Sequence, residues 1–175
     1  MNFNELNLQL NKDVNSFEFN GNTINVLKYL PIEEKNDLVY LTLQNADEGG
    51  EYNLLKITMF FRLYITYLYT DIEFALEDKA DPDKLYNILE SNGLFAEIVG
   101  HMEEGEYEYL TEALETTLEN RMEYRNTLGA TITSFIEKLV PNAESAMSIL
   151  NNFNPEDFGN VMNFVKAINN GQIPQ

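Results

Sequence analysis

Residues 17–26 of this 175-residue chain read FEFNGNTINV, and this stretch decides the fold class. Phe17 and Phe19 alternate with polar residues, and Ile24 and Val26 do the same after the turn at 20–22. Alternation with a period of two predicts half-buried strands. Asn-Gly between two such runs is the strongest short signal for a β-hairpin. An antiparallel hairpin is therefore expected here.

The same alternation continues upstream of the hairpin. Leu6, Leu8 and Leu10 are separated by Asn7 and Gln9. Strands are therefore expected over residues 5–30, as a small antiparallel sheet of two or three strands.

The rest of the chain predicts helices. Pro31 suits a first helical position. Gly129 is expected to end the long helix that precedes it. An acidic connector is expected at 71–80, and Gly100 is expected to close a short segment at 94–99. The other predicted helices lie between Pro31 and the break at 47–50, and at about 52–69, 82–92, 104–126, 132–139, 143–151 and 155–169. The predicted fold is α+β, a small N-terminal antiparallel hairpin or sheet (1–30) packed on a mostly α-helical body (31–175) within one domain.

The expected helix at 52–69 is apolar on almost every side. A helix of this kind is normally central to the fold. We expect a buried core helix, and the alternative is an exposed aromatic surface that a partner covers.

Composition excludes several classes of function. The chain has 29 acidic and 11 basic residues, a formal net charge of −18, no cysteine and a single histidine. Disulfides, thiolate zinc sites, cysteine nucleophiles and His-rich metal centres are excluded, and the acidity argues against direct binding of nucleic acid. The most apolar window, 57–69, is too short to span a bilayer, and the N-terminus does not resemble a signal peptide. No cofactor or metal is expected.

His101 is the one candidate for acid–base chemistry. It could pair with Glu103 or Glu104, but no second imidazole and no motif for a nucleophile accompany it. The expectation is a protein that binds and does not catalyse, with a small acid–base enzyme using His101 and Glu104 as the weakest alternative.

The acidity is regional. Residues 71–123 hold 16 acidic residues against Lys79, Lys84 and Arg121. Five glutamates of the predicted long helix recur every three or four residues over about 22 Å, so they line one face next to its apolar stripe. Like charges at this spacing repel by roughly 0.2–0.5 kcal/mol per pair. The candidate partner-binding residues are Glu104, Glu108, Glu112, Glu115, Glu119 and Glu123. A merely solvated charged face is the alternative.

Three stretches carry a family resemblance: residues 17–35, residues 86–94, and the tail from 151–153 through 170–171. Together they resemble acidic proteins encoded among the virion-structure genes of bacteriophages that infect low-GC Gram-positive bacteria. The resemblance covers most of the chain and implies a phage origin and a role in head or tail morphogenesis, for example as a tail assembly chaperone. It assigns no functional residues.

The leading hypothesis is therefore a non-enzymatic phage protein that binds another protein during virion assembly. Its helical stripes would cover an aggregation-prone partner, and its acidity would steer docking. The alternative is an inhibitor of a host defence nuclease that imitates nucleic acid, of the anti-CRISPR or anti-restriction type. Either protein would work in the host cytoplasm, or be incorporated in the virion. One more apolar face is expected near the C-terminus, and it either forms a dimer interface or completes the core. It comprises Phe153, Phe158, Val161, Phe164 and Val165.

Overall fold

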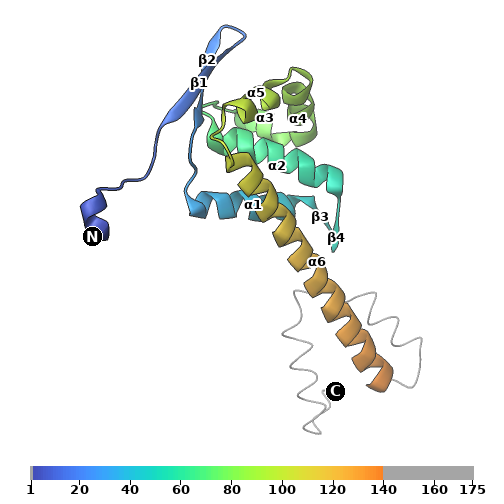
Figure 1. Ribbon diagram of the computed structural model, residues 1–175. Helices are drawn as coiled ribbons and strands as arrows, with labels where there is room; N and C mark the ends of the chain where they lie inside the picture. The colour runs from blue at the N-terminus through green and yellow to red at the C-terminus, as the bar shows by residue number, and fades with distance from the viewer. Residues whose placement is uncertain (1, 140–175) are drawn as a thin grey trace. The chain divides into compact units, whose positions relative to one another are not determined.

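The computed structural model of the chain describes residues 2–139, with side chains up to residue 131 (Figure 1). It is mostly helical with an antiparallel hairpin near the N-terminus, so the α+β prediction is confirmed. The chain divides into two compact units, residues 1–118 and 119–175. The hairpin belongs to the first unit together with the helical residues up to 118.

The predicted hairpin is present. β1 (Val14–Phe19) pairs with β2 (Asn22–Leu27), with Phe17 opposite Ile24. Both turn residues have positive φ, 50° at Asn20 and 79° at Gly21, which is the conformation that favours Asn-Gly in two-residue hairpin turns. Phe17, Ile24 and Val26 are buried, so one face of the hairpin enters the core.

The strand predicted around Leu6, Leu8 and Leu10 is wrong. Residues Phe3–Leu6 form a short 3₁₀ helix, η1, and residues 7–13 have no regular secondary structure. Every described side chain before β1 is exposed. We call residues 3–13 the N-terminal arm.

The first two helices are joined by a second, very small hairpin. Pro31 is the N-cap of α1 (Ile32–Ala46), one position before the expected first helical residue. β3 (Asp47–Glu48) and β4 (Glu51–Tyr52) then flank the Gly49-Gly50 turn. Asn53 caps α2 (Leu54–Tyr69), its side chain accepting from the backbone N–H groups of the first helical turn.

α2 is the central helix, as its composition predicts. It packs against α1, α4 and α5, and it buries Ile57, Phe61, Ile65 and Tyr69 in the main core. The interpretation as a core helix is therefore confirmed. Its first turn is the exception, because Leu54 and Leu55 are exposed.

Three short helices follow: α3 (Leu76–Ala80), α4 (Pro82–Ser91) and α5 (Leu94–His101). The expected acidic connector thus contains a helical turn. The caps at Asp81 and Gly93 fall where the sequence predicts them. Gly100 lies inside α5 and does not close it, because one helical glycine costs only about 1 kcal/mol relative to alanine.

α6 (Glu106–Leu139) begins two residues later than predicted, after Gly105 with a φ of 81°. It also continues through Gly129, so the expected break is wrong and the predicted helix at 132–139 is its last part. A lone glycine without a proline does not stop a helix. The predictions for 143–151, 155–169 and the apolar face from Phe153 to Val165 lie outside the described residues.

None of the helices within residues 2–139 combines the length and the apolar character needed to cross a bilayer.

Candidate functional site: the acidic face of α6

The start of α6 is fixed by a buried ion pair. Lys35 of α1 places its Nζ 2.7 Å from Glu106 Oε1 and 2.9 Å from Glu106 Oε2. The Tyr69 hydroxyl and the Leu30 backbone N–H also donate to Glu106 Oε1, at 3.0 and 3.2 Å. Three donor groups, making four contacts with one carboxylate, compensate its desolvation, which is what a buried charge requires. The contacts tie α6 to α1, to the end of α2 and to the segment after β2.

Two aromatic rings flank the same ammonium group. Lys35 Nζ lies 4.3 Å from the centre of the Tyr29 ring and 4.9 Å from that of Tyr109, within the range of cation–π contacts. Burial, and then the negative charge of Glu106, raise the pKa of Tyr69 well above its usual value. Tyr69 is therefore a neutral hydrogen-bond donor at ordinary pH.

The apolar stripe of α6 is used inside the first unit. Leu110 and Leu114 are buried in the main core, with Tyr107 and Leu118 packed against it. These four residues are therefore packed inside the first unit and do not offer an apolar stripe to a partner. In the second unit, Met122 is exposed.

The predicted glutamates lie on another side of α6, about a third of a turn from the apolar stripe. In the first unit, Glu104 lies in the turn before the helix, and Glu108, Glu112 and Glu115 lie on the helix; all four side chains are exposed. At 100° per residue, these helical glutamates face away from Leu110 and Leu114. Within residues 2–131, none of the four carboxylates makes an ion pair.

Glu119 and Glu123 belong to the second unit. Both are exposed residues of α6. The first-unit glutamates therefore form a candidate surface of their own, and we call Glu108, Glu112 and Glu115 the acidic face.

His101 is engaged in holding the hairpin. Its ring stacks on Phe17 with a centroid distance of 4.6 Å, and Nδ1 lies 2.8 Å from the Glu97 carbonyl oxygen. The side chain of Asn15 in β1 donates to the His101 carbonyl at 2.8 Å. These contacts join β1 to α5, while Glu103 and Glu104 are exposed. The arrangement accounts for the histidine as a structural contact.

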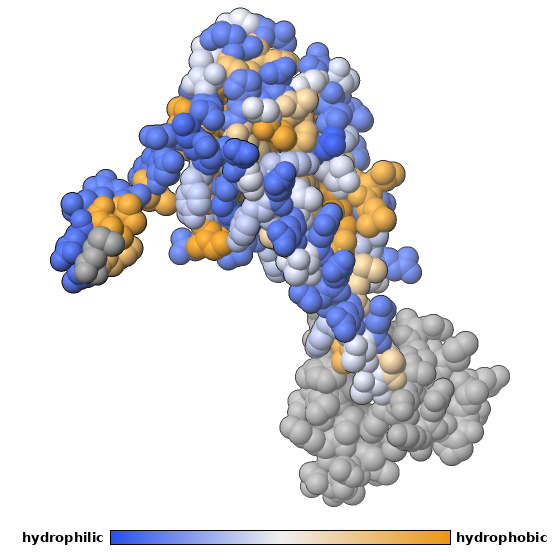
Figure 2. Space-filling model, in the orientation of Figure 1, coloured by the Kyte–Doolittle hydropathy of each residue, from blue (hydrophilic) through white to orange (hydrophobic). Residues whose placement is uncertain are grey.

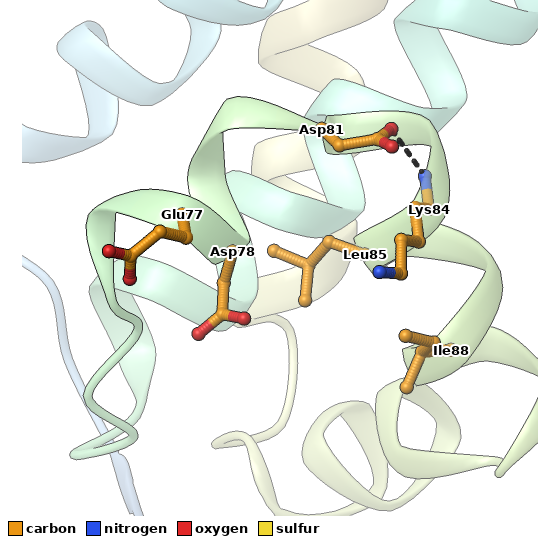
Figure 3. A pocket seen from close by; sticks show the side chains of 6 residues that line it. All are labelled: Glu77, Asp78, Asp81, Lys84, Leu85 and Ile88. Atoms are coloured by element: carbon orange, nitrogen blue, oxygen red, sulfur yellow. Dashed lines mark hydrogen bonds between the residues drawn. The ribbon is translucent and has the colours of Figure 1, made fainter.

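A small pocket of about 90 Å³ lies between α3 and α4 (Figure 3). Its carboxylates are Glu77, Asp78 and Asp81, and Leu85 and Ile88 form its apolar side. Asp81 is already used, because it accepts from the Lys84 backbone N–H as the cap of α4. No cluster of three metal-ligating side chains occurs among the described residues.

The network around Lys35 and Glu106 has no signature in the sequence. The two residues are 71 positions apart, and each looks like an ordinary surface residue of its own helix.

No family model, curated protein or solved structure matches this chain.

Proposed function

We propose that this chain is a non-enzymatic bacteriophage protein that binds another protein during virion assembly through the acidic face of α6. The observation that carries the proposal is the exposure of Glu108, Glu112 and Glu115 without ion-pair partners among the described residues. The sequence resemblance to phage morphogenesis proteins supplies the context.

The acidic face is suited to docking because its geometry is held in place. The buried Lys35–Glu106 pair anchors the first turn of α6, and Leu110 and Leu114 anchor the next two turns in the core. A fixed row of like charges produces a directed field, which raises the rate of encounter with a positively charged surface. The expected partner is therefore a phage structural protein with a basic patch, met in the host cytoplasm or in the assembling virion.

A nuclease inhibitor is the second candidate, and the spacing of the glutamates favours it. Glu108 and Glu112 are about 6 Å apart along the helix axis at 1.5 Å per residue. Successive phosphates of one DNA strand are separated by about 3.4 Å along the helix axis, so two phosphate steps cover a similar length. The acidic face could then occupy the nucleic-acid groove of a host defence nuclease.

Affinity purification of the tagged full chain from phage-infected cells, followed by mass spectrometry, tests the proposal. Recovery of capsid or tail proteins supports the proposed role in virion assembly. Recovery of a host nuclease alone contradicts that role and supports the inhibitor function. Recovery of neither contradicts both.

Charge reversal identifies the surface. The pair Glu108→Lys with Glu112→Lys should abolish capture of the partner. The matched control is Glu33→Lys with Asp37→Lys, an exposed acidic pair with the same spacing on α1. Capture by the intact chain should also weaken as salt rises, because the contact is electrostatic. Equal loss in both pairs would mean that total charge, and not the acidic face, governs binding.

A further inference from the structure

Exposed side chains gather around the buried Lys35 at the surface of the first unit. Tyr29, Ile32 and Tyr109 are 38%, 50% and 47% exposed. Lys35 Nζ contacts both tyrosine rings, and Ile32 lies three residues before Lys35 on the same side of α1. We call Tyr29, Ile32 and Tyr109 the tyrosine patch. Figure 2 shows mostly hydrophilic residues on the visible face of the described chain, and exposed apolar side chains that cluster within such a surface are typical of interaction sites.

The tyrosine patch adjoins the acidic face. Glu112 follows Tyr109 by three residues on α6, so its carboxylate and the tyrosine ring are neighbours on the helix surface. Glu108 lies one turn before Glu112 on the same helix. Lys35 does not cancel these two charges, because its ammonium group is paired with Glu106 in the buried ion pair. An exposed aromatic ring and an exposed carboxylate therefore lie side by side.

The rings of the tyrosine patch already bind one cation. Lys35 Nζ lies 4.3 Å from the centre of the Tyr29 ring and 4.9 Å from that of Tyr109, within the range of cation–π contacts. The Tyr109 side chain is nevertheless half-exposed, so its ring can also contact a cation from outside the chain. A cation at that position would have the Glu112 carboxylate beside it, and the two contacts would form together.

The charge around the patch decides what kind of molecule fits it. A symmetric contact with a second copy of this chain would bring the same carboxylates against each other, and nucleic acid would bring phosphates against them. Both are repelled, whereas a cationic protein segment is attracted. Arginine fits better than lysine, because its planar guanidinium stacks on an aromatic ring and donates to a carboxylate at the same time.

We propose that the tyrosine patch binds an arginine-bearing segment of the partner protein, with one guanidinium stacked on Tyr109 and paired with Glu112. The inference rests on the proposed function, since it uses the same surface, and adds the chemistry of the partner to it. The tyrosine patch forms the desolvated centre of the interface, and the other glutamates of the acidic face form its charged rim. The rim then sets the rate of association, and the stacked arginine sets the lifetime of the complex.

Two matched peptides test the partner chemistry. One fluorescently labelled peptide carries arginine at every fourth residue of an alanine background, and the second carries lysine at the same positions. Fluorescence anisotropy with the full chain measures the Kd of each peptide. The arginine peptide should bind about tenfold more tightly, because only a guanidinium gains both the stacked contact and the forked hydrogen bonds.

Variants of the exposed tyrosines locate the site. Tyr109→Leu keeps a good helix former but removes the ring, so it should weaken the arginine peptide to the affinity of the lysine peptide. Tyr109→Phe keeps the ring and should retain the preference for arginine. The matched control is Tyr40→Leu, because Tyr40 is 53% exposed on α1 and follows Asp37 by three residues. This control should also retain the preference.

The outcomes separate this inference from the proposed function. Equal affinity of the intact chain for the two peptides, or an arginine preference that survives in Tyr109→Leu, would overturn the inference and leave the proposed function standing. Loss of the preference in Tyr40→Leu would also overturn it, because any exposed tyrosine near a carboxylate would then suffice. If the pair Glu108→Lys with Glu112→Lys leaves the binding of both peptides unchanged, the acidic face is not a docking surface and the proposed function fails as well.

Discussion

Lys35 and Glu106, from helices α1 and α6, form an ion pair of 2.7 Å in which both side chains are nearly inaccessible to water. The pair fixes where α6 leaves the core, and with it the position of the acidic face. Because both charges are buried, each depends on the other for compensation, and removal of one is more damaging than removal of both.

Lys35→Met should therefore destabilise the protein by about 3 kcal/mol, since it leaves the Glu106 carboxylate buried without its counter-charge. Urea unfolding followed by circular dichroism measures this loss. The double variant Lys35→Met/Glu106→Leu should recover at least half of it. If the losses of the two single variants simply add in the double variant, the two charges are not coupled and the packing of each side chain accounts for its effect.

Tyr69 makes stability sensitive to high pH. Its pKa is raised by burial and by the charge of Glu106, so the folded protein keeps the hydroxyl proton where an unfolded tyrosine loses it. The unfolded state then binds fewer protons, and stability must fall as pH rises past about 10, the ordinary tyrosine value. Denaturant titrations at several pH values should show this fall. In Tyr69→Phe the fall should be shallower, with a lower stability at neutral pH from the lost hydrogen bond.

Asp71 should make the stability of the protein sensitive to low pH. The Asn25 backbone N–H donates to its carboxylate and lowers the pKa. A depressed pKa means that this stabilisation is present above the ordinary aspartate value and is lost as pH falls through the folded value. The side chain is exposed, so the contribution is small, about 0.5–1 kcal/mol. Asp71→Ala should therefore lower stability at pH 7 but not at pH 2, as acid unfolding curves would show. Equal losses at both pH values would assign the effect to packing.

Sequence patterns predicted the elements whose causes are local. The Asn20-Gly21 turn, the Asp81 cap with Pro82, and the apolar composition of α2 each specify structure within a few residues, and each prediction is confirmed. The predicted helix ends at Gly100 and Gly129 are wrong. A helical glycine costs less free energy than a helix gains by packing on a core.

Features that depend on distant partners could not be predicted in this way. The pattern of Leu6, Leu8 and Leu10 indicates a strand, but a strand forms only where an edge of matching register is present. The exposure of Glu108, Glu112 and Glu115 did follow from the helical period. The buried state of Glu106, on the same helix and of the same residue type, follows only from Lys35 and Tyr69 in the folded chain.

The glycines at 21 and 100 should respond to alanine with opposite sign. Gly21 has a φ of 79°, a conformation that costs an L-residue roughly 1–2 kcal/mol, so Gly21→Ala should destabilise the hairpin by about that amount. Gly100 lies within α5, and an added Cβ would meet no atom within 4 Å. Gly100→Ala should therefore stabilise the protein by about 0.5–1 kcal/mol through helix propensity. Thermal unfolding of the two variants beside the parent provides the measurement. A gain at Gly21, or a loss at Gly100, would mean that the local backbone differs from the one described, since no side-chain contact competes with the backbone effect at either position.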